Sequence, residues 1–493
     1  LPSSVEDVNL VAKINSPNPD MSDMVVDIPK FHMNMAGNPL DMTLTLTDAM
    51  NDAHMKASAK GKLILSKVKD VVPLEAGTNL NGTFLADLNV DGKLSSLENE
   101  QYQDFKASGN MKILDFQYES DSLDYPVSIS SANLDFTNQF AELSNLKMNV
   151  GKSDIQGSGR LEGFIPYAMT ETGVLKGNVD ISSNLIDANE LMGITPGEIT
   201  EEAEAPEAEE PMEAVPVPKN VYVTLNAKVN QLLYDNLDIK NVAAKLQVKD
   251  EKVSILNSSL NMLGGQLSAN GFYETTDISR PTFDFGLNIK DFNLQETVEK
   301  FVSIEKIAPI TKKTIGAFST DFQLKGAFDG SMDPIYETLF GEGGLSTSNI
   351  EVKDFKPLEK IGQALNSSTL ANPVLKDLRL SLSIADGKLF VAPFTNTIGD
   401  IKMTVAGSNS FDQMINYVLS FEVPREKLGS SVNNAANQLF AQASSKGLNL
   451  ELAEYVYVDA IISGPFTDPN VKIDLKETVS KITDDLKDQA KQA

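Results

Sequence analysis

An almost unbroken alternation of apolar and polar residues constrains this chain most strongly, and residues 376–424 show it most clearly. Successive side chains of a β-strand point to opposite faces of the sheet, so a period of two predicts strands with one apolar and one polar face. Asp386-Gly387 supplies a two-residue hairpin turn after the first run. The pattern predicts an antiparallel meander. The apolar positions that we identify as candidates for lining an apolar groove are Leu378, Leu380, Leu382, Ile384, Ile401, Met403, Val405, Tyr417, Leu419 and Phe421.

The same alternation fills most of the chain and suggests a weak internal repeat. Meanders are predicted within 127–182 and 237–289, and Gly159, Gly271 and Gly407 occupy similar places in corresponding strands, which indicates a period of about 100 residues. We therefore predict a first β-meander unit at 1–75, a second at 76–194, an acidic linker at 195–219, a third unit at 220–308, and a C-terminal β unit with capping helices at 309–493.

Helical periodicity is confined to short stretches between these meanders. The predicted fold is therefore mostly β, built from repeated antiparallel strand meanders, with a few short amphipathic helices. A helix or turn is expected at 67–74 and a turn at Asp91-Gly92, and helices are expected at 185–192, 293–305, 353–370, 428–443 and 475–486.

The segment 195–219 interrupts the alternation with eight glutamates, five prolines and no basic residue before Lys219. Such a composition cannot bury enough apolar area to offset its chain entropy, so we expect a disordered linker or loop. An acidic recognition segment is the alternative reading.

Composition excludes several classes of function. A formal net charge of −27 argues against nucleic-acid binding, which needs a concentrated basic surface. Because the chain has no cysteine, it has no disulfide, thiolate metal site or cysteine nucleophile. His32 and His54 are the only histidines, and neither has a second imidazole nearby in sequence. We expect no metal and no cofactor.

Catalytic motifs are absent from the sequence. It contains no phosphate-binding GxxxxGK[ST], no HExxH and no GxSxG. The Asp-Gly pairs at Asp91, Asp329 and Asp386 do not extend into a calcium-binding loop, and we interpret them as turns. We therefore expect a protein without enzymatic activity. A glycan hydrolase, which would use a carboxylate pair, is the enzymatic alternative.

The abundance of one-sided strands allows two interpretations. Half-buried strands commonly pack face to face as β-sandwiches, and core packing would then account for every apolar side chain. The apolar faces, however, belong to a chain with 16 methionines, no tryptophan and 7% aromatic residues. Flexible thioether side chains suit a surface that adapts to variable apolar ligands, as an open groove would be. On the residue pattern alone, the β-sandwich remains the more common arrangement and the open groove its alternative.

Five segments resemble the AsmA family of envelope proteins, in the form found in the Bacteroidota. They are AKGKLILSKVKDVVPLEAG at 59–77, YQDFKASGNMKILDFQY at 102–118, GKSDIQGSGRLEGFIPY at 151–167, LKGNVDISSNLIDANELMG at 175–193 and VDAIISGPFTDPNVKIDL at 458–475. The resemblance covers most of the chain and rests on the order of these segments.

The resemblance implies a periplasmic body in which an elongated, twisted antiparallel β-sheet forms a taco-like groove, related to TamB and to bridge-like lipid-transfer proteins. Its concave face would hold phospholipid acyl chains, without catalysis, in support of outer-membrane biogenesis. A single N-terminal helix would tether it to the inner membrane, and an outer-membrane partner could complete the route. No stretch here reaches the roughly 18 apolar residues of a membrane span, so we expect such an anchor upstream of Leu1. The alternative is a scaffold or assembly factor that recruits envelope proteins through exposed β-edges.

Overall fold

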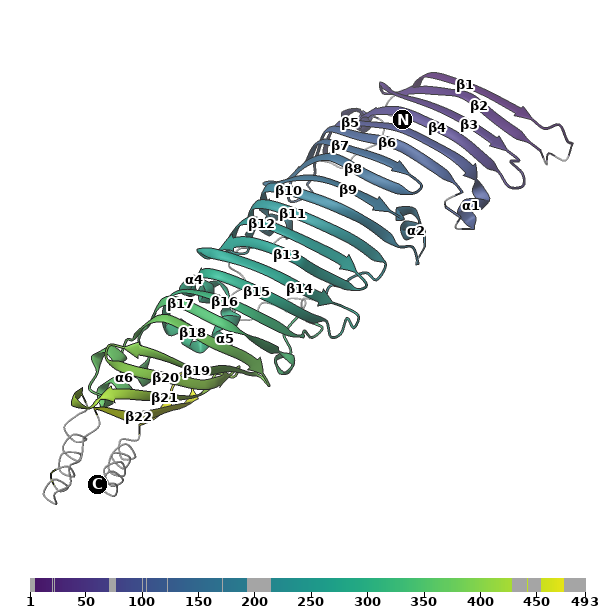
Figure 1. The fold of residues 1–493 in the computed structure, drawn as a ribbon. Helices are drawn as coiled ribbons and strands as arrows, with labels where there is room; N and C mark the ends of the chain where they lie inside the picture. The colour runs from purple at the N-terminus through teal and green to yellow at the C-terminus, as the bar shows by residue number, and fades with distance from the viewer. Residues whose placement is uncertain are drawn as a thin grey trace. The chain divides into compact units, whose positions relative to one another are not determined.

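The computed structural model describes residues 5–70, 77–192, 214–427, 441 and 454–473, except positions 20, 22, 100, 103, 122 and 171. These residues are mostly β, and the 23 strands that they form belong to one sheet (Figure 1). The chain divides into two compact units, each described below by itself. The first comprises Leu1–Glu210, Val215–Leu260 and Glu274–Thr276, and the second Pro211–Ala214, Asn261–Tyr273 and Asp277–Ala493.

In the first unit, each strand from β1 to β11 pairs with the next one in sequence. All of these pairs are antiparallel except β10 with β11, which is parallel. The strands are β1 (Val5–Asn15), β2 (Val25–Met35), β3 (Asn38–Thr47), β4 (His54–Ile64), β5 (Asn79–Lys93), β6 (Lys106–Glu119), β7 (Val127–Thr137), β8 (Phe140–Val150), β9 (Ser153–Glu162), β10 (Leu175–Asp187), β11 (Val221–Tyr234), β12 (Leu237–Lys249) and β13 (Lys252–Met262), whose last residues belong to the second unit.

In the second unit, the strands from β15 to β23 also pair in sequence order, and every pair is antiparallel. The predicted turn at Asp386-Gly387 is present, and both residues have the positive φ that such turns require. The strands are β14 (Gly265–Glu274), β15 (Thr282–Asn293), β16 (Thr314–Ala327), β17 (Phe340–Val352), β18 (Val374–Ala385), β19 (Lys388–Ile398), β20 (Ile401–Ser410), β21 (Met414–Pro424), β22 (Tyr455–Pro465) and β23 (Asn470–Ile473).

The helices in the described residues are all short. They are α1 (Leu94–Glu98), α2 (Phe164–Met169), α3 (Ala188–Met192), α4 (Leu294–Lys300), α5 (Val302–Ile307) and α6 (Lys356–Ala364), with 3-10 turns η1 (Leu65–Asp70), η2 (Pro309–Lys313), η3 (Tyr336–Thr338), η4 (Ser368–Leu370) and η5 (Arg425–Lys427). In the first unit, α1, α2 and α3 contact β5, β10 and β11 respectively. In the second unit, α4 contacts β16 and α6 contacts β23.

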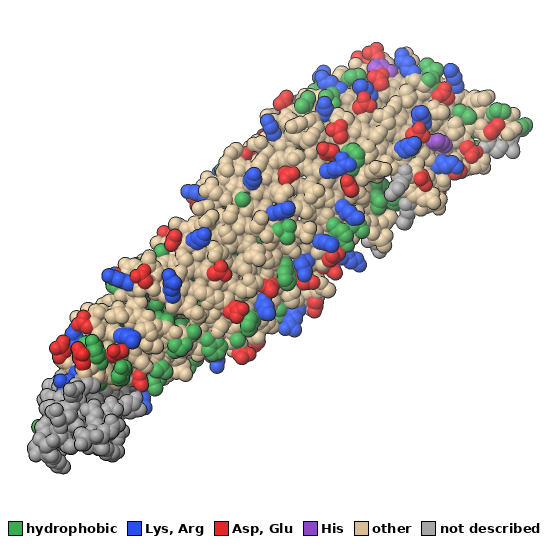
Figure 2. Space-filling view, in the orientation of Figure 1, with side chains coloured by type: hydrophobic (Ala, Val, Ile, Leu, Met, Phe, Trp, Pro, Cys, Tyr) green, Lys and Arg blue, Asp and Glu red, His purple; other side chains and the backbone are tan. Residues whose placement is uncertain are grey.

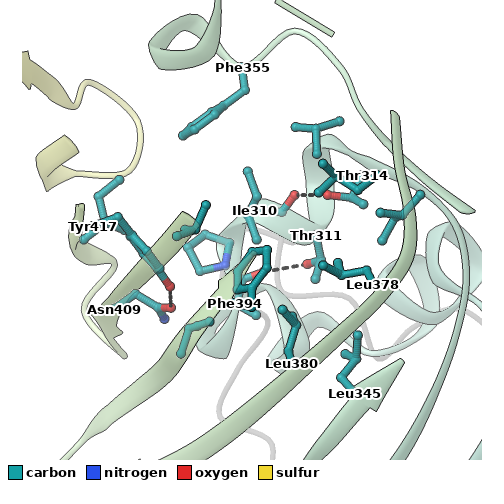
Figure 3. A pocket seen from close by; sticks show the side chains of 18 of the residues that line it. Ile310, Thr311, Thr314, Leu345, Phe355, Leu378, Leu380, Phe394, Asn409 and Tyr417 are labelled. Carbon is teal, nitrogen blue, oxygen red and sulfur yellow. Dashed lines mark hydrogen bonds between the residues drawn. The ribbon is translucent and has the colours of Figure 1, made fainter. Parts of the chain in front are cut away.

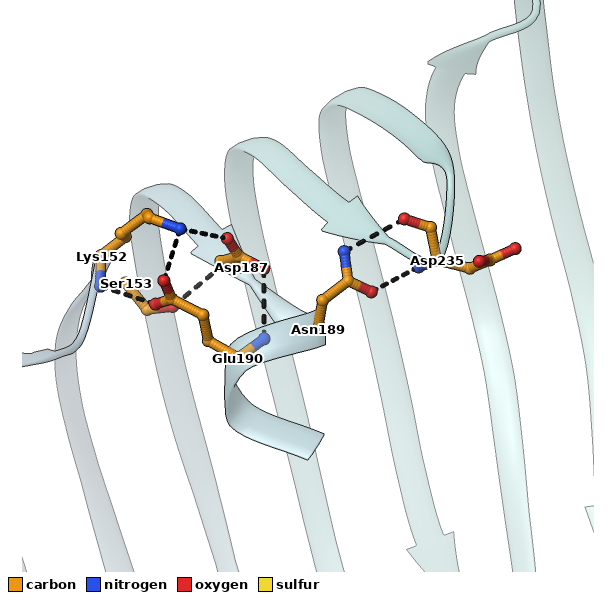
Figure 4. Close-up of polar contacts among 6 residues, drawn as sticks. All are labelled: Lys152, Ser153, Asp187, Asn189, Glu190 and Asp235. Atoms are coloured by element: carbon orange, nitrogen blue, oxygen red, sulfur yellow. Dashed lines mark hydrogen bonds and ion pairs between the residues drawn. The ribbon is translucent and has the colours of Figure 1, made fainter. Parts of the chain in front are cut away.

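Helix α3 connects two turns on either side of β10 (Figure 4). The Lys152 ammonium lies 2.5 Å from Oε1 of Glu190, lowering the pKa of that carboxyl and raising its own pKa. Asp187 accepts a hydrogen bond from the Glu190 amide at 3.2 Å and caps the helix. Asn189 donates to the Asp235 carbonyl at 3.1 Å and accepts from the Asp235 amide at 2.6 Å. These contacts fix the end of β10 where the pairing becomes parallel.

Irregular pairing recurs in neighbouring strands of the second unit. The register shifts between Ile289 and Phe292 in β15, between Gly316 and Ser319 in β16, and between Val391 and Phe394 in β19. Asp377 in β18 has a φ of 49°. The alternation of side chains between the two faces is interrupted there, so Leu375 and Leu378, three positions apart, lie on the same face. Such bulges bend a strand and increase its twist.

Several local predictions were wrong. Asp91-Gly92 makes no turn, because β5 continues through it to Lys93. The helix expected at 185–192 begins only at Ala188, because β10 extends to Asp187. The helix expected at 293–305 is broken at Phe301 into α4 and α5, and the one expected at 353–370 is only Lys356–Ala364 followed by η4.

Some predictions fall partly or wholly outside the described residues. These are most of the acidic linker at 195–219, part of the helix or turn at 67–74, and the two late helices at 428–443 and 475–486. The strands follow the apolar alternation through both units, so the mostly β class and the repeated meander are confirmed.

Candidate functional site

Two rows of apolar side chains, aligned by the pairing of neighbouring strands, cross one face of the first unit's sheet. Directly paired residues of neighbouring strands lie on the same face, so each row can be followed from β2 to β12 through the strand register. The first row is Met33, Leu40, Gly61, Ala86, Met111, Leu134, Leu143, Gly159, Val179, Leu225 and Leu246. The second is Phe31, Met42, Ala59, Leu88, Gly109, Phe136, Ala141, Leu161, Gly177, Val223 and Val248. We call these two rows the first-unit apolar face.

The opposite face of the same strands is polar. Its row lies between the two apolar rows in sequence and consists of His32, Asp41, Lys60, Asp87, Asn110, Asp135, Glu142, Arg160, Asn178, Thr224 and Gln247. Ion pairs join Lys60 to Asp87 at 3.1 Å and Arg160 to Glu142 at 3.2 Å. The face in view in Figure 2 carries many such scattered charges. The sheet of the first unit therefore has one polar face, which suits contact with water, and one apolar face.

The first-unit apolar face is not buried. Every residue of both rows keeps partial exposure, and Met42 is 38% exposed. In the second unit, by contrast, Ile361, Leu365 and Leu370 are 0% exposed, in a region where α6 packs against η4 and β23. Most buried hydrophobic side chains of the described residues lie in the second unit. The apolar face of the first unit is thus available to a ligand.

The second unit contains an apolar cavity of about 260 Å³ that is partly open to solvent. Strands β16 to β22 supply one wall, and Leu294, the segment 308–311 and α6 supply the other (Figure 3). Phe355 and Phe466 stack across one part of it, with ring centroids 5.6 Å apart. No charged side chain lines the cavity among the described residues.

The few polar groups that line the cavity are all paired with the protein. Thr311 and Thr314 donate their hydroxyls to the carbonyls of Ala308 and Ile310, at 2.7 and 2.8 Å. Tyr417 donates to Oδ1 of Asn409 at 3.0 Å, and the Asn409 amide donates to the Ile307 carbonyl. The cavity therefore offers a ligand apolar contacts rather than free donors or acceptors.

Gly407 positions the Tyr417 ring. The two residues are directly paired across β20 and β21, and a Cβ on Gly407 would fall 2.5 Å from Cδ1 of Tyr417. The missing side chain lets the ring lie across the strand toward Asn409. Burial raises the pKa of Tyr417 to about 12, so its hydroxyl remains a hydrogen-bond donor at neutral pH.

The structure distributes the sequence-predicted groove residues between two environments. Those that line the cavity are Leu378, Leu380, Leu382, Met403, Val405, Tyr417 and Leu419. Ile384 instead packs with Phe283, Leu339 and Leu389 in a buried cluster. Ile401 and Phe421 are 2% and 1% exposed and belong to the core.

Several lining residues were missed by sequence reasoning. Leu294, Ile310, Phe355 and Leu358 come from segments that fold over the sheet, and no local periodicity marks such long-range packing. The first-unit apolar face was predicted only as alternating strands, because neighbouring side chains become a row only through the register. Strand β11 was missed entirely, although Val223, Leu225 and Val229 alternate within it.

Comparison of the chain with known protein families, with curated proteins and with solved structures finds no match.

None of the helices in the described residues is long and apolar enough to cross a membrane. No three of their His, Asp or Glu side chains come close enough together to hold a metal ion. His32 and His54 each pair with a carboxylate, Asp41 and Asp91 respectively, at 2.7 Å on exposed positions.

Proposed function

We propose that this protein binds lipids by their acyl chains and transfers them without catalysis. The observation that carries the proposal is the first-unit apolar face, two continuous rows of apolar or small residues that remain partly exposed. Monomeric proteins seldom expose apolar surface in a continuous patch unless it binds a partner or ligand. An acyl chain suits such a surface because each buried methylene contributes roughly 0.8 kcal/mol without a directional contact.

The composition of the rows supports loose binding. Glycine and alanine are interspersed among larger residues, for example Gly159 beside Val179 and Leu143, and side chains of the larger neighbours lie over the glycines. No row member is charged, so a lipid headgroup would remain in water. Binding that depends on area alone allows a chain to move along a face, as transfer requires.

The resemblance to the AsmA family supports a biological setting for this activity. In that setting the protein works in the periplasm of a Gram-negative bacterium, is tethered to the inner membrane by a segment outside this chain, and contributes phospholipid to outer-membrane biogenesis.

The experiment is uptake of an environment-sensitive fluorescent phospholipid by the purified chain. Leu225→Glu places a charge in the apolar row, and Thr224→Glu places the same charge one residue away on the polar face. We expect uptake by the parent and by T224E, and at least about a tenfold loss for L225E, since an acyl chain lying on this row would remove water from the introduced carboxylate. Equal uptake by the two variants would contradict the proposal.

A second candidate function is supported by β1. All of its residues are exposed, and it pairs only with β2 among the described strands, so its outer edge could accept a strand from another protein. In this scaffold function, the β-edge rather than the apolar face would be the working surface. Replacing Val11 by proline should then weaken partner binding and leave lipid uptake unchanged.

A further inference from the structure

The cavity of the second unit differs chemically from the open face of the first. Its lining contains no charged side chain, and the hydroxyls of Thr311, Thr314 and Tyr417 are already paired with protein acceptors. A headgroup inside it would lose its hydration without gaining partners, which is costly. A hydrocarbon chain has no hydrogen bonds to water to lose, so it can enter without this cost. The cavity is therefore suited to the tail of an amphiphile and excludes its head.

The size of the cavity fits part of one chain. Apolar cavities of about 150 Å³ stay dry and are large enough to bind benzene. A volume of about 260 Å³ accommodates a longer hydrocarbon segment but not a whole two-chain lipid. Phe355 and Phe466 stack over one part of the space and limit how far a chain can extend.

A gap in strand pairing lies beside the cavity. Strands β18 and β19 pair only from Leu382–Val391 to Ala385–Lys388, next to their turn. Beyond this point no backbone pairing joins them in the described residues, and one side-chain bond, from Asn396 to the Lys376 carbonyl at 2.8 Å, bridges the two strands. We call this stretch the β18–β19 seam.

Residues from both sides of the seam line the cavity. Leu378 and Leu380 come from β18 and Phe394 comes from β19, and all three point into the same space (Figure 3). Because few backbone hydrogen bonds hold the seam, its strands can separate at less cost than their fully paired neighbours.

We propose that this cavity receives the end of one unbranched acyl chain, tail first, through the β18–β19 seam, while the headgroup stays outside. The inference rests on the proposed lipid-binding function and adds a second, tail-specific site to it. It gives the bound lipid a defined orientation in the second unit.

The test uses two photoreactive phosphatidylcholines presented to the full chain in phosphatidylcholine vesicles. One carries a diazirine near the methyl end of an acyl chain, and the other carries it next to the ester. After irradiation, crosslinked peptides are located by mass spectrometry. We expect the methyl-end probe to label peptides from 374–419 at least about tenfold more than the ester-end probe does.

The other outcomes separate the two proposals. Equal labelling of 374–419 by both probes would overturn the tail-first orientation. Labelling confined to the first unit would overturn the cavity site and leave lipid binding standing. Labelling of neither unit would contradict the proposed function itself.

A matched pair of variants tests occupancy of the cavity. Val405→Phe fills part of the space, whereas Val418→Phe adds the same bulk at a residue of the adjacent strand that is 43% exposed and does not line the cavity. With strand content checked by circular dichroism, we expect V405F to lose labelling by long chains and retain it for chains a few carbons shorter. An unchanged chain-length profile in V405F would contradict the proposal. If V405F does not fold, the proposal is tested by the cysteine variants of the β18–β19 seam.

Disulfides test the seam, since the parent chain has no cysteine of its own. Cysteines at Lys376 and Asn396 would close the seam, and cysteines at Ser383 and Phe390 would staple a pair that is already in register. We expect oxidation of the first pair alone to reduce methyl-end labelling about tenfold, with recovery on reduction. Labelling that is insensitive to the first disulfide would overturn access through the seam.

Discussion

Tyr417 donates a hydrogen bond from its hydroxyl to Oδ1 of Asn409, 3.0 Å away on the neighbouring strand. The Asn409 amide in turn donates to the Ile307 carbonyl, at the end of α5. This chain of two bonds ties the segment that covers the cavity to the sheet beneath it. We expect these two hydrogen bonds to hold the segment that ends at Ile307 in place over the cavity.

The first prediction concerns the stability that this contact contributes. Tyr417→Phe removes the hydroxyl and leaves Oδ1 of Asn409 without its donor, so we expect a loss of about 1–3 kcal/mol in the free energy of unfolding. Chemical denaturation of the full chain, parent against variant, measures this loss. Tyr457→Phe, at a side chain that is 64% exposed, is the control and should change stability by less than about 0.5 kcal/mol.

The second prediction is a pH dependence at high pH. Burial raises the pKa of Tyr417 to about 12, so the folded state holds this proton more tightly than the unfolded state does. The resulting stability is fully present below the ordinary pKa of about 10 and is lost as the pH rises toward 12. Comparing denaturation of the parent and Tyr417→Phe between pH 9 and 12 should show a steeper loss for the parent. Parallel curves would contradict the assignment.

The third prediction concerns α3 in the first unit. Asn189→Ala removes both hydrogen bonds to the Asp235 backbone, and we expect a cost of about 1–2 kcal/mol and faster hydrogen exchange at the Asp235 amide. Asn178→Ala, on the exposed polar face, serves as the control. If exchange at Asp235 did not change, α3 would not fix the β11–β12 turn.

The fourth prediction contrasts the two units. Leu365→Ala removes a side chain that is fully buried in the second unit, and we expect a cost of about 2–5 kcal/mol. Leu225→Ala removes one from the first-unit apolar face, where partial exposure leaves less to lose, and should cost less than about 1.5 kcal/mol. Similar costs would show that the first-unit face is covered as thoroughly as the core of the second.

The sequence predicts the strands well because a period of two is a local property. Strands β9, β20 and β21 follow the apolar alternation along their whole length. The bulges were not predictable in the same way. Asp377 reads as an ordinary polar strand residue, yet its positive φ places Leu375 and Leu378 on one face.

The candidate site depends more on packing between distant segments than on local pattern. Leu378 and Met403 could be identified from alternation, but Ile310 and Phe355 line the same cavity from outside the strands. Alternation also cannot distinguish a covered face from an open one, because Phe421 in the core and Leu225 on the first-unit apolar face belong to the same kind of pattern. Which face is covered is decided by where α4, α5 and α6 fold.

The most direct test of the account is native mass spectrometry of the chain, expressed in a Gram-negative host and purified without any step that removes bound lipid. The account predicts species heavier than the bare chain by the mass of one or more phospholipids, which Leu225→Glu diminishes and Thr224→Glu leaves intact. A parent protein that appears only as the bare chain, under conditions in which a known lipid-binding protein keeps its ligand, would contradict it.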